Sequence, residues 1–137
     1  MSETLQDTIQ QLIEQHHGQI VSIRRHLHMH PELSFGEEKT GKYIQSLMTE
    51  FGIPFTSGWA GYGVVGILEC QKPDTAVVAL RADMDALPIL EENDVPYKST
   101  RPGVMHACGH DVHTSSLLGA VDPGLQLGKN QRGTQQR

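Results

Sequence analysis

The sequence predicts a layered α/β domain, and three observations carry that prediction. Residues 4–51 place apolar side chains at helical spacing, whereas the runs 63–70 and 75–82 are short, β-branched and almost continuously apolar. Acidic, cysteine and histidine side chains follow the second run, where open α/β sheets place their sites. A chain of 137 residues is long enough to bury one core.

Two helices are expected in the first half of the chain. The first covers residues 4–28, where apolar residues recur at steps of three and four. The second follows a break at 29–34, because Ser34 and Glu37 have the spacing of a capping box and Gly52 suits the helix end. The apolar stripe of this second helix consists of Tyr43, Ile44, Leu47, Met48 and Phe51.

The period changes after the second helix. The runs "GVVGILEC" (63–70) and "TAVVALRA" (75–82) predict neighbouring strands, the second buried on both faces. A proline-rich loop and a helix from residue 112, with Asp111 as a candidate N-cap, follow. We expect the sheet core, packed on Leu47, Met48 and Phe51, to consist of Val64, Val65, Ile67, Val77, Val78 and Leu80.

The end of the sequence departs from this pattern. Residues 121–137 contain Pro123 and two glycines, show no periodicity and end in a polar, basic tract. We therefore expect a folded unit over 1–120, followed by a non-homologous, disordered tail over 121–137.

Composition excludes several classes of function. The formal net charge of −5 argues against a nucleic-acid partner, because phosphate binding needs a basic face. No apolar run approaches the roughly 18–20 residues that span a bilayer, and the N-terminus lacks the pattern of a signal peptide. We expect both cysteines, Cys70 and Cys108, to be reduced and the protein to be cytoplasmic, with no membrane partner.

The stretch "VMHACGHDVH" (104–113) holds three histidines, one cysteine and one aspartate. Cys108 and His110 lie two positions apart, so in a loop or extended backbone they can share a divalent metal such as zinc. Asp83 and Asp85 lie at the end of the second apolar run. Two clusters that are separate in sequence can therefore meet at one rim of the sheet.

Simpler interpretations of these residues exist. A Cys–x–His pair can be incidental, and His106 and His113 can be structural or solvated. The tract "HLHMHP" looks like a metal-binding segment, but His26 and His30 at a helix end can simply cap it or face water. A cysteine hydrolase with Cys108 as nucleophile is a further alternative.

Three blocks in order, "RRHLHMHPELSFGEEKT", "ALRADMDALPILE" and "GVMHACGHDVHTSSLLGA", resemble the metal-dependent aminoacylase and carboxypeptidase family, in the branch of hippurate hydrolase, N-acyl-amino-acid amidohydrolases and auxin-conjugate hydrolases. The resemblance implies two divalent ions, often manganese or zinc, with Cys108 and His110 as ligands. Asp85 matches the aspartate that orients a ligand, whereas Asp83 stands where the wider pattern has a histidine.

The resemblance implies hydrolysis of the amide bond of an N-acyl amino acid or small peptide. The resemblance also implies a lid domain through which family members form homodimers. The remaining metal ligands of the family, and the glutamate that acts as general base, lie further downstream in its members. This sequence has no glutamate after Glu92 and no histidine after His113. We therefore expect the N-terminal portion of a zinc-peptidase-like domain, truncated, without lid or general base. The alternative function is that of an inactive remnant with weak metal binding.

Overall fold

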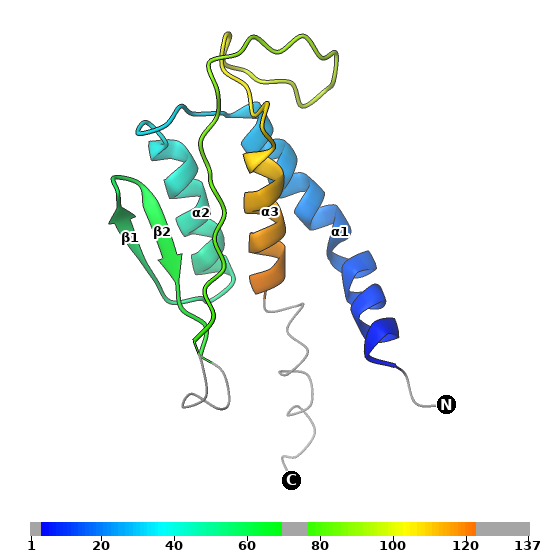
Figure 1. The fold of residues 1–137 in the computed structure, drawn as a ribbon. Helices are drawn as coiled ribbons and strands as arrows, with labels where there is room; N and C mark the ends of the chain where they lie inside the picture. Colours follow the sequence, from blue (N-terminus) through cyan, green and yellow to red (C-terminus); the bar gives the residue numbers. More distant parts are fainter. Residues whose placement is uncertain (1–3, 70–76, 123–137) are drawn as a thin grey trace.

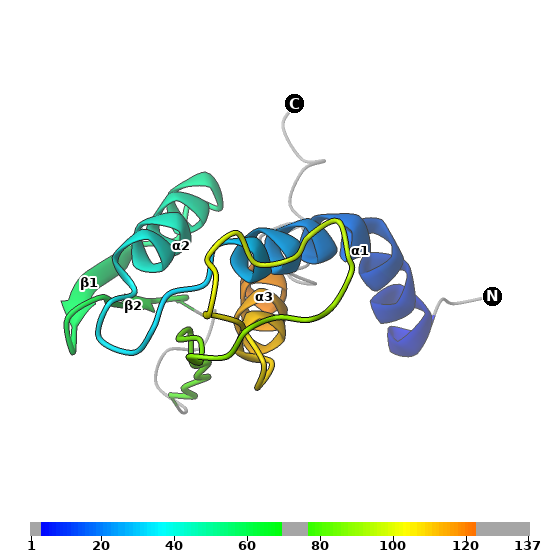
Figure 2. The ribbon, with the colours of Figure 1, turned by 90° about the horizontal axis from the view of Figure 1, so that it is seen from above.

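The computed structural model describes residues 4–69 and 77–122. Along the chain these form helices α1 (Leu5–Met29) and α2 (Glu38–Glu50), strands β1 (Phe55–Trp59) and β2 (Gly63–Gly66), and helix α3 (His110–Val121). The hairpin of β1 and β2 packs on α2, and α1 packs against α3 on the other side of α2 (Figures 1 and 2). The predicted α/β class is therefore confirmed.

Helix α1 agrees with the prediction almost to the residue. It begins with a capping box in which Thr4 Oγ1 accepts from the Asp7 amide at 3.2 Å and Asp7 Oδ2 accepts from the Thr4 amide at 3.1 Å. Gly18 does not interrupt the helix. The side chains of Thr4 and Asp7 thereby accept hydrogen bonds from backbone amides at the start of α1.

The predicted start of the second helix is wrong. Glu37 is the N-cap of α2 and makes no side-chain capping bond, while the Ser34 hydroxyl donates to Asp85 instead. The carboxylate of Glu32 takes over the capping task, accepting from the Thr40 amide at 2.8 Å and the Thr40 hydroxyl at 2.9 Å. Local spacing failed here because a partner from a distant segment engages Ser34.

The two predicted strands had different outcomes. Strand β2 lies inside the predicted run 63–70, and it pairs antiparallel with β1, which the sequence did not suggest. Residues 77–82 form no strand in the structure, and residues 75 and 76 lie outside the described part. Val77 is 95% and Val78 80% exposed, so this strand and its part of the sheet core were predicted wrongly. A strand buried on both faces needs neighbours, and the described segments supply none to 77–82.

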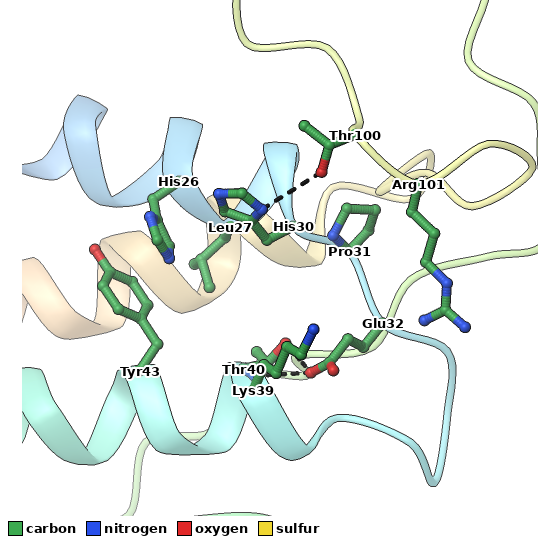
Figure 3. Close-up of a pocket in the computed structure, with 10 residues that line it drawn as sticks. All are labelled: His26, Leu27, His30, Pro31, Glu32, Lys39, Thr40, Tyr43, Thr100 and Arg101. Atoms are coloured by element: carbon green, nitrogen blue, oxygen red, sulfur yellow. Dashed lines mark hydrogen bonds between the residues drawn. The ribbon is translucent and has the colours of Figure 1, made fainter.

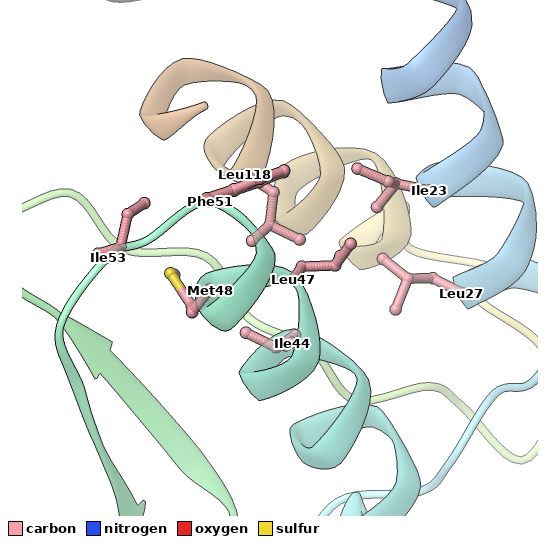
Figure 4. Close-up of a cluster of buried hydrophobic side chains, with 8 residues drawn as sticks. All are labelled: Ile23, Leu27, Ile44, Leu47, Met48, Phe51, Ile53 and Leu118. Atoms are coloured by element: carbon pink, nitrogen blue, oxygen red, sulfur yellow. The ribbon is translucent and has the colours of Figure 1, made fainter. Parts of the chain in front are cut away.

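The core lies where the three helices meet rather than over a sheet (Figure 4). Leu47, Met48 and Phe51 are buried as expected, whereas Val65 and Ile67 are exposed and Val64 is only partly buried. The buried cluster consists of Ile23, Leu27, Ile44, Leu47, Met48, Phe51, Ile53 and Leu118. At Gly119 a side chain would press on Ile20 of α1, so this glycine lets the two helices approach closely.

Helix α3 begins two residues before the expected start. Its N-cap is Gly109, with a φ of 85°, so Asp111 lies in the first turn and is not the N-cap. The helix ends at Val121, and residues 123–137 of the predicted tail lie outside the described part of the chain. Across the two described ranges, no helix has the length and apolar character needed to cross a bilayer.

Candidate metal centre

His110, the first residue of α3, is held by Asp85 from the loop that precedes the helix. Its Nδ1 lies 2.9 Å from Asp85 Oδ1 and 3.0 Å from the Asp85 backbone carbonyl oxygen. A carbonyl oxygen only accepts hydrogen bonds, so Nδ1 carries the hydrogen. In the neutral ring, Nε2 therefore keeps its lone pair, which is the arrangement of a histidine oriented by a carboxylate to bind a metal.

Asp85 is itself fixed by a second contact. The Ser34 hydroxyl donates to Asp85 Oδ2, leaving Oδ1 for His110. The hydrogen bond from Ser34 lowers the pKa of Asp85 below its ordinary value; partial burial opposes this, and His110 adds to it. The carboxylate therefore stays ionised at neutral pH and can hold His110 in one tautomer.

Cys108 lies two positions before His110 and its side chain is exposed, with a free thiol. Gly109 between them has a φ of 85°, a left-handed conformation that glycine adopts without a steric penalty. The turn at Gly109 thus joins an accessible thiol to the oriented imidazole at the start of α3. Thiolate and imidazole are both donors that zinc accepts.

Within residues 4–69 and 77–122, no group of three or more histidine, cysteine, aspartate and glutamate side chains is arranged to hold a metal. A catalytic zinc site has three protein ligands, so the pair Cys108 and His110 fits a metal in donor type but does not complete a site here. Asp83 does not join the pair, because its carboxylate contacts Arg81. The ring of His113 lies 5.9 Å from that of His110.

A buried cluster of polar side chains holds the first turn of α3 against α1. The sequence did not reveal this cluster. His28 of α1 has Nδ1 at 2.7 Å from Asp111 Oδ2 and Nε2 at 3.0 Å from Glu91 Oε1. Arg24 Nε lies 2.9 Å from the same Asp111 oxygen. The position of Arg24 and His28 one turn apart was visible in the sequence, but their partners come from residues more than 60 positions away.

Glu91 anchors the loop that leads to Cys108. Its Oε2 accepts from the Ser99 amide at 2.6 Å and its Oε1 faces His28, with Asn93 Nδ2 at 3.3 Å. Burial acts to raise the pKa of Glu91, but the bonds from Ser99, His28 and Asn93 outweigh it, so the pKa lies below its ordinary value. An ionised Glu91 thus ties α1 to the loop.

His106 is the second buried histidine of this region. It is 4% exposed, and neither ring nitrogen has a hydrogen-bond partner in the described part of the chain. Its ring lies 6.4 Å from that of His28. Burial lowers the pKa of His106, with smaller and opposing effects of the charges nearby, which favours the neutral ring. The sequence left open whether His106 is structural or solvated, and its burial fits a structural role.

Comparison with known proteins gives consistent matches. The model of Peptidase family M20/M25/M40 matches residues 79–134. The YhaA protein of Bacillus subtilis (strain 168) is 52% identical over 115 residues, which are 84% of this chain and 29% of the relative. An N-acyl-L-amino acid amidohydrolase of Geobacillus stearothermophilus is 46% identical over 127 residues, which are 93% of this chain and 34% of the relative.

Solved structures agree with these sequence matches. The Bacillus subtilis YXEP protein, described as a dinuclear metal binding peptidase from the M20 family, superposes with a TM-score of 0.74 at 42% identity. The match covers 78% of this chain and 30% of that one. A Staphylococcus aureus structure gives a TM-score of 0.81 at 37% identity, covering 90% of this chain and 32% of that one. This chain spans about a third of the length of the relatives it matches.

Proposed function

Because this chain belongs to peptidase family M20/M25/M40, we propose that it carries part of the metal centre of an amidohydrolase that cleaves N-acyl amino acids or small peptides. Cys108 and His110 are the proposed ligands of a divalent ion, manganese or zinc, and Asp85 is the residue that orients His110. The observation that carries the proposal is the contact of His110 Nδ1 with Oδ1 and the backbone carbonyl oxygen of Asp85, which leaves Nε2 available.

A bound divalent ion would supply Lewis acidity toward the carbonyl oxygen of the scissile amide. The residues of this chain supply the setting for that chemistry. Asp85 fixes the tautomer of His110, Ser34 fixes Asp85, and the buried contact of Asp111 with His28 holds the first turn of α3 in place. The general base is not among the residues we assign, since the sequence has no glutamate after Glu92.

A second candidate function is weak metal binding without turnover by the polypeptide of this sequence alone. The observation that favours it is that no third histidine, cysteine, aspartate or glutamate joins Cys108 and His110 among the described residues. Two protein ligands hold a metal less firmly than the three of a catalytic zinc site. We also propose a cytoplasmic location, because a reducing compartment keeps a ligand cysteine in the thiol form.

Cobalt(II) titration tests the metal centre, because a thiolate bound to cobalt gives a charge-transfer absorption band in the near ultraviolet. We expect this band in the unaltered chain and its loss in Cys108→Ser, with Cys70→Ser as the matched control. Asp85→Asn should weaken binding by about 10- to 100-fold, the usual effect of removing such a supporting carboxylate. A band that survives in Cys108→Ser, or is lost in Cys70→Ser, would contradict the assignment.

Turnover and alkylation separate the candidate functions. The purified chain is assayed with zinc or manganese on N-acetyl-methionine and hippurate, and we expect no hydrolysis above background. Hydrolysis that requires Cys108 and disappears on chelation would show that this chain builds a working site.

Alkylation distinguishes a ligand cysteine from a nucleophilic one. Metal should protect Cys108 from iodoacetamide if the thiolate is a ligand, whereas rapid alkylation with metal present would favour the alternative of a nucleophilic cysteine.

A further inference from the structure

The C-terminal end of α1 carries two histidines that the metal centre above does not use, His26 in the last turn and His30 at the C-cap. These two histidines lie four positions apart in sequence, and their ring centroids are 4.7 Å apart. Both side chains are exposed and line a pocket of about 610 Å³ (Figure 3). We propose that His26 and His30 form a second site, with its own ligands, for a transition-metal ion of the zinc type.

The surroundings of His30 select the tautomer that a ligand needs. The Thr100 hydroxyl donates to the Met29 carbonyl oxygen at 2.6 Å, so its hydrogen is already engaged. Toward His30 Nδ1, at 3.5 Å, the Thr100 oxygen can therefore only accept. The ring hydrogen of neutral His30 is thereby directed to Nδ1 and the lone pair to Nε2. Figure 3 shows this other ring nitrogen on the side of His26.

The ring of His26 is also held in place. It stacks on Tyr43 of α2, with ring centroids 3.9 Å apart and an interplanar angle of 27°. Fixing the ring plane lowers the entropic cost of binding, because the ligand is already ordered before the metal arrives. His26 in the last turn and His30 at the C-cap, with ring centroids 4.7 Å apart, thus form a pair that can chelate one ion at the end of α1.

The charges in the pocket are divided between its two ends. Lys39 and Arg101 lie at the end of Glu32, away from the two imidazoles (Figure 3). Oε2 of Glu32 accepts both hydrogen bonds from Thr40, and this carboxylate lies at the end of the pocket away from the two imidazoles (Figure 3). The histidine end therefore offers two nitrogen donors, and water would complete the coordination. Imidazole donors favour zinc, nickel or copper over magnesium or calcium.

Zinc titration by calorimetry tests this site in a Cys108→Ser/His110→Asn background, which removes the other proposed ligands. We expect one zinc ion per chain in this background and a drop in affinity of at least about tenfold in either His26→Gln or His30→Gln. His17→Gln is the matched control, because His17 is an exposed histidine of the same helix with no histidine four positions away. It should leave the affinity unchanged. Affinity unchanged by His26→Gln and His30→Gln, or no binding at all, would overturn the proposal.

A second measurement uses the unaltered chain and does not depend on how the variants fold. Diethyl pyrocarbonate modifies accessible histidines, and mass spectrometry locates the modified positions. Zinc should protect His26 and His30 together while His17 remains reactive. Equal modification of His26 and His30 with and without zinc would overturn the site, whatever the outcome at Cys108 and His110.

Discussion

Polar side chains are buried at the start of α3, whereas apolar side chains are exposed along residues 77–80. Asp111 and His28 are 1% and 3% exposed, while Val77 and Val78 are 95% and 80% exposed. The difference lies in the partners that the described chain supplies. The buried polar groups find hydrogen-bond or ion-pair partners on three separate segments, whereas among the described residues the apolar run finds no strand or helix to cover it.

The largest test of this comparison removes a buried partner. Asp111→Ala leaves His28 and Arg24 facing a site without its carboxylate, and breaking such a buried pair costs about 3–5 kcal/mol. We expect urea unfolding of the metal-free protein to show a loss of this size. Asp83→Ala is the matched control, because Asp83 pairs with an Arg81 side chain that is 84% exposed, and such pairs contribute about 0–1 kcal/mol. Equal losses in both variants would show that the buried cluster is not formed in solution.

A second test truncates two leucines, one buried and one exposed, to alanine. Leu118 on α3 is 2% exposed, so Leu118→Ala should reduce the free energy of unfolding by about 2–5 kcal/mol. Leu80 is 67% exposed, so Leu80→Ala should change it by less than about 0.5 kcal/mol. Chemical denaturation of both variants measures the difference. A large loss in Leu80→Ala would mean that the segment 77–80 is covered in solution, which would remove the contrast.

Much of the helical structure was predictable because its causes are local. The period of three and four residues located α1 and α2, and Leu47, Met48 and Phe51 are buried as their stripe indicated. The run 75–82 misled because β-branched apolar residues indicate a strand only if neighbouring strands pair with it. Composition alone does not reveal whether those neighbours are present.

The candidate site was predictable only in part, for a related reason. The residue types and spacing of Cys108 and His110 indicated metal ligands, and the structure places the Asp85 carboxylate beside His110. The roles of Asp85, Cys108 and His110 remain predictions. The cluster of His28, Glu91 and Asp111 was missed because its members are more than 60 positions apart in sequence. Side-chain pairs of that kind leave no periodic signal.

Acid unfolding tests how much the buried Glu91 carboxylate contributes to stability. The pKa of Glu91 is lower in the folded protein than its ordinary value of 4.5, so the unfolded chain binds the proton more readily. The stability from Glu91 is therefore complete above about pH 4.5 and is lost as the pH falls through the lowered folded pKa. Glu91→Gln should cost about 1.5–3 kcal/mol at neutral pH, the range for hydrogen bonds to charged groups. Its stability should also fall less steeply with acid, as urea titrations across pH would measure; an unchanged acid dependence would contradict the lowered pKa.

The smallest expected effect concerns the turn that joins the two proposed metal ligands. A Cβ added at Gly109 would meet no atom within 4 Å, so any cost of Gly109→Ala comes from its φ of 85° and not from a clash. That left-handed conformation costs a residue with a side chain about 1–2 kcal/mol, and asparagine tolerates it better than alanine. We expect Gly109→Ala to lower the free energy of unfolding by that amount and Gly109→Asn by less. Gly18→Ala, in the interior of α1 with equally open space, should instead raise it by up to about 1 kcal/mol. Urea unfolding in which Gly109→Ala matches Gly18→Ala would show that the turn between Cys108 and His110 is not left-handed, and the support that it gives to a shared metal would be lost.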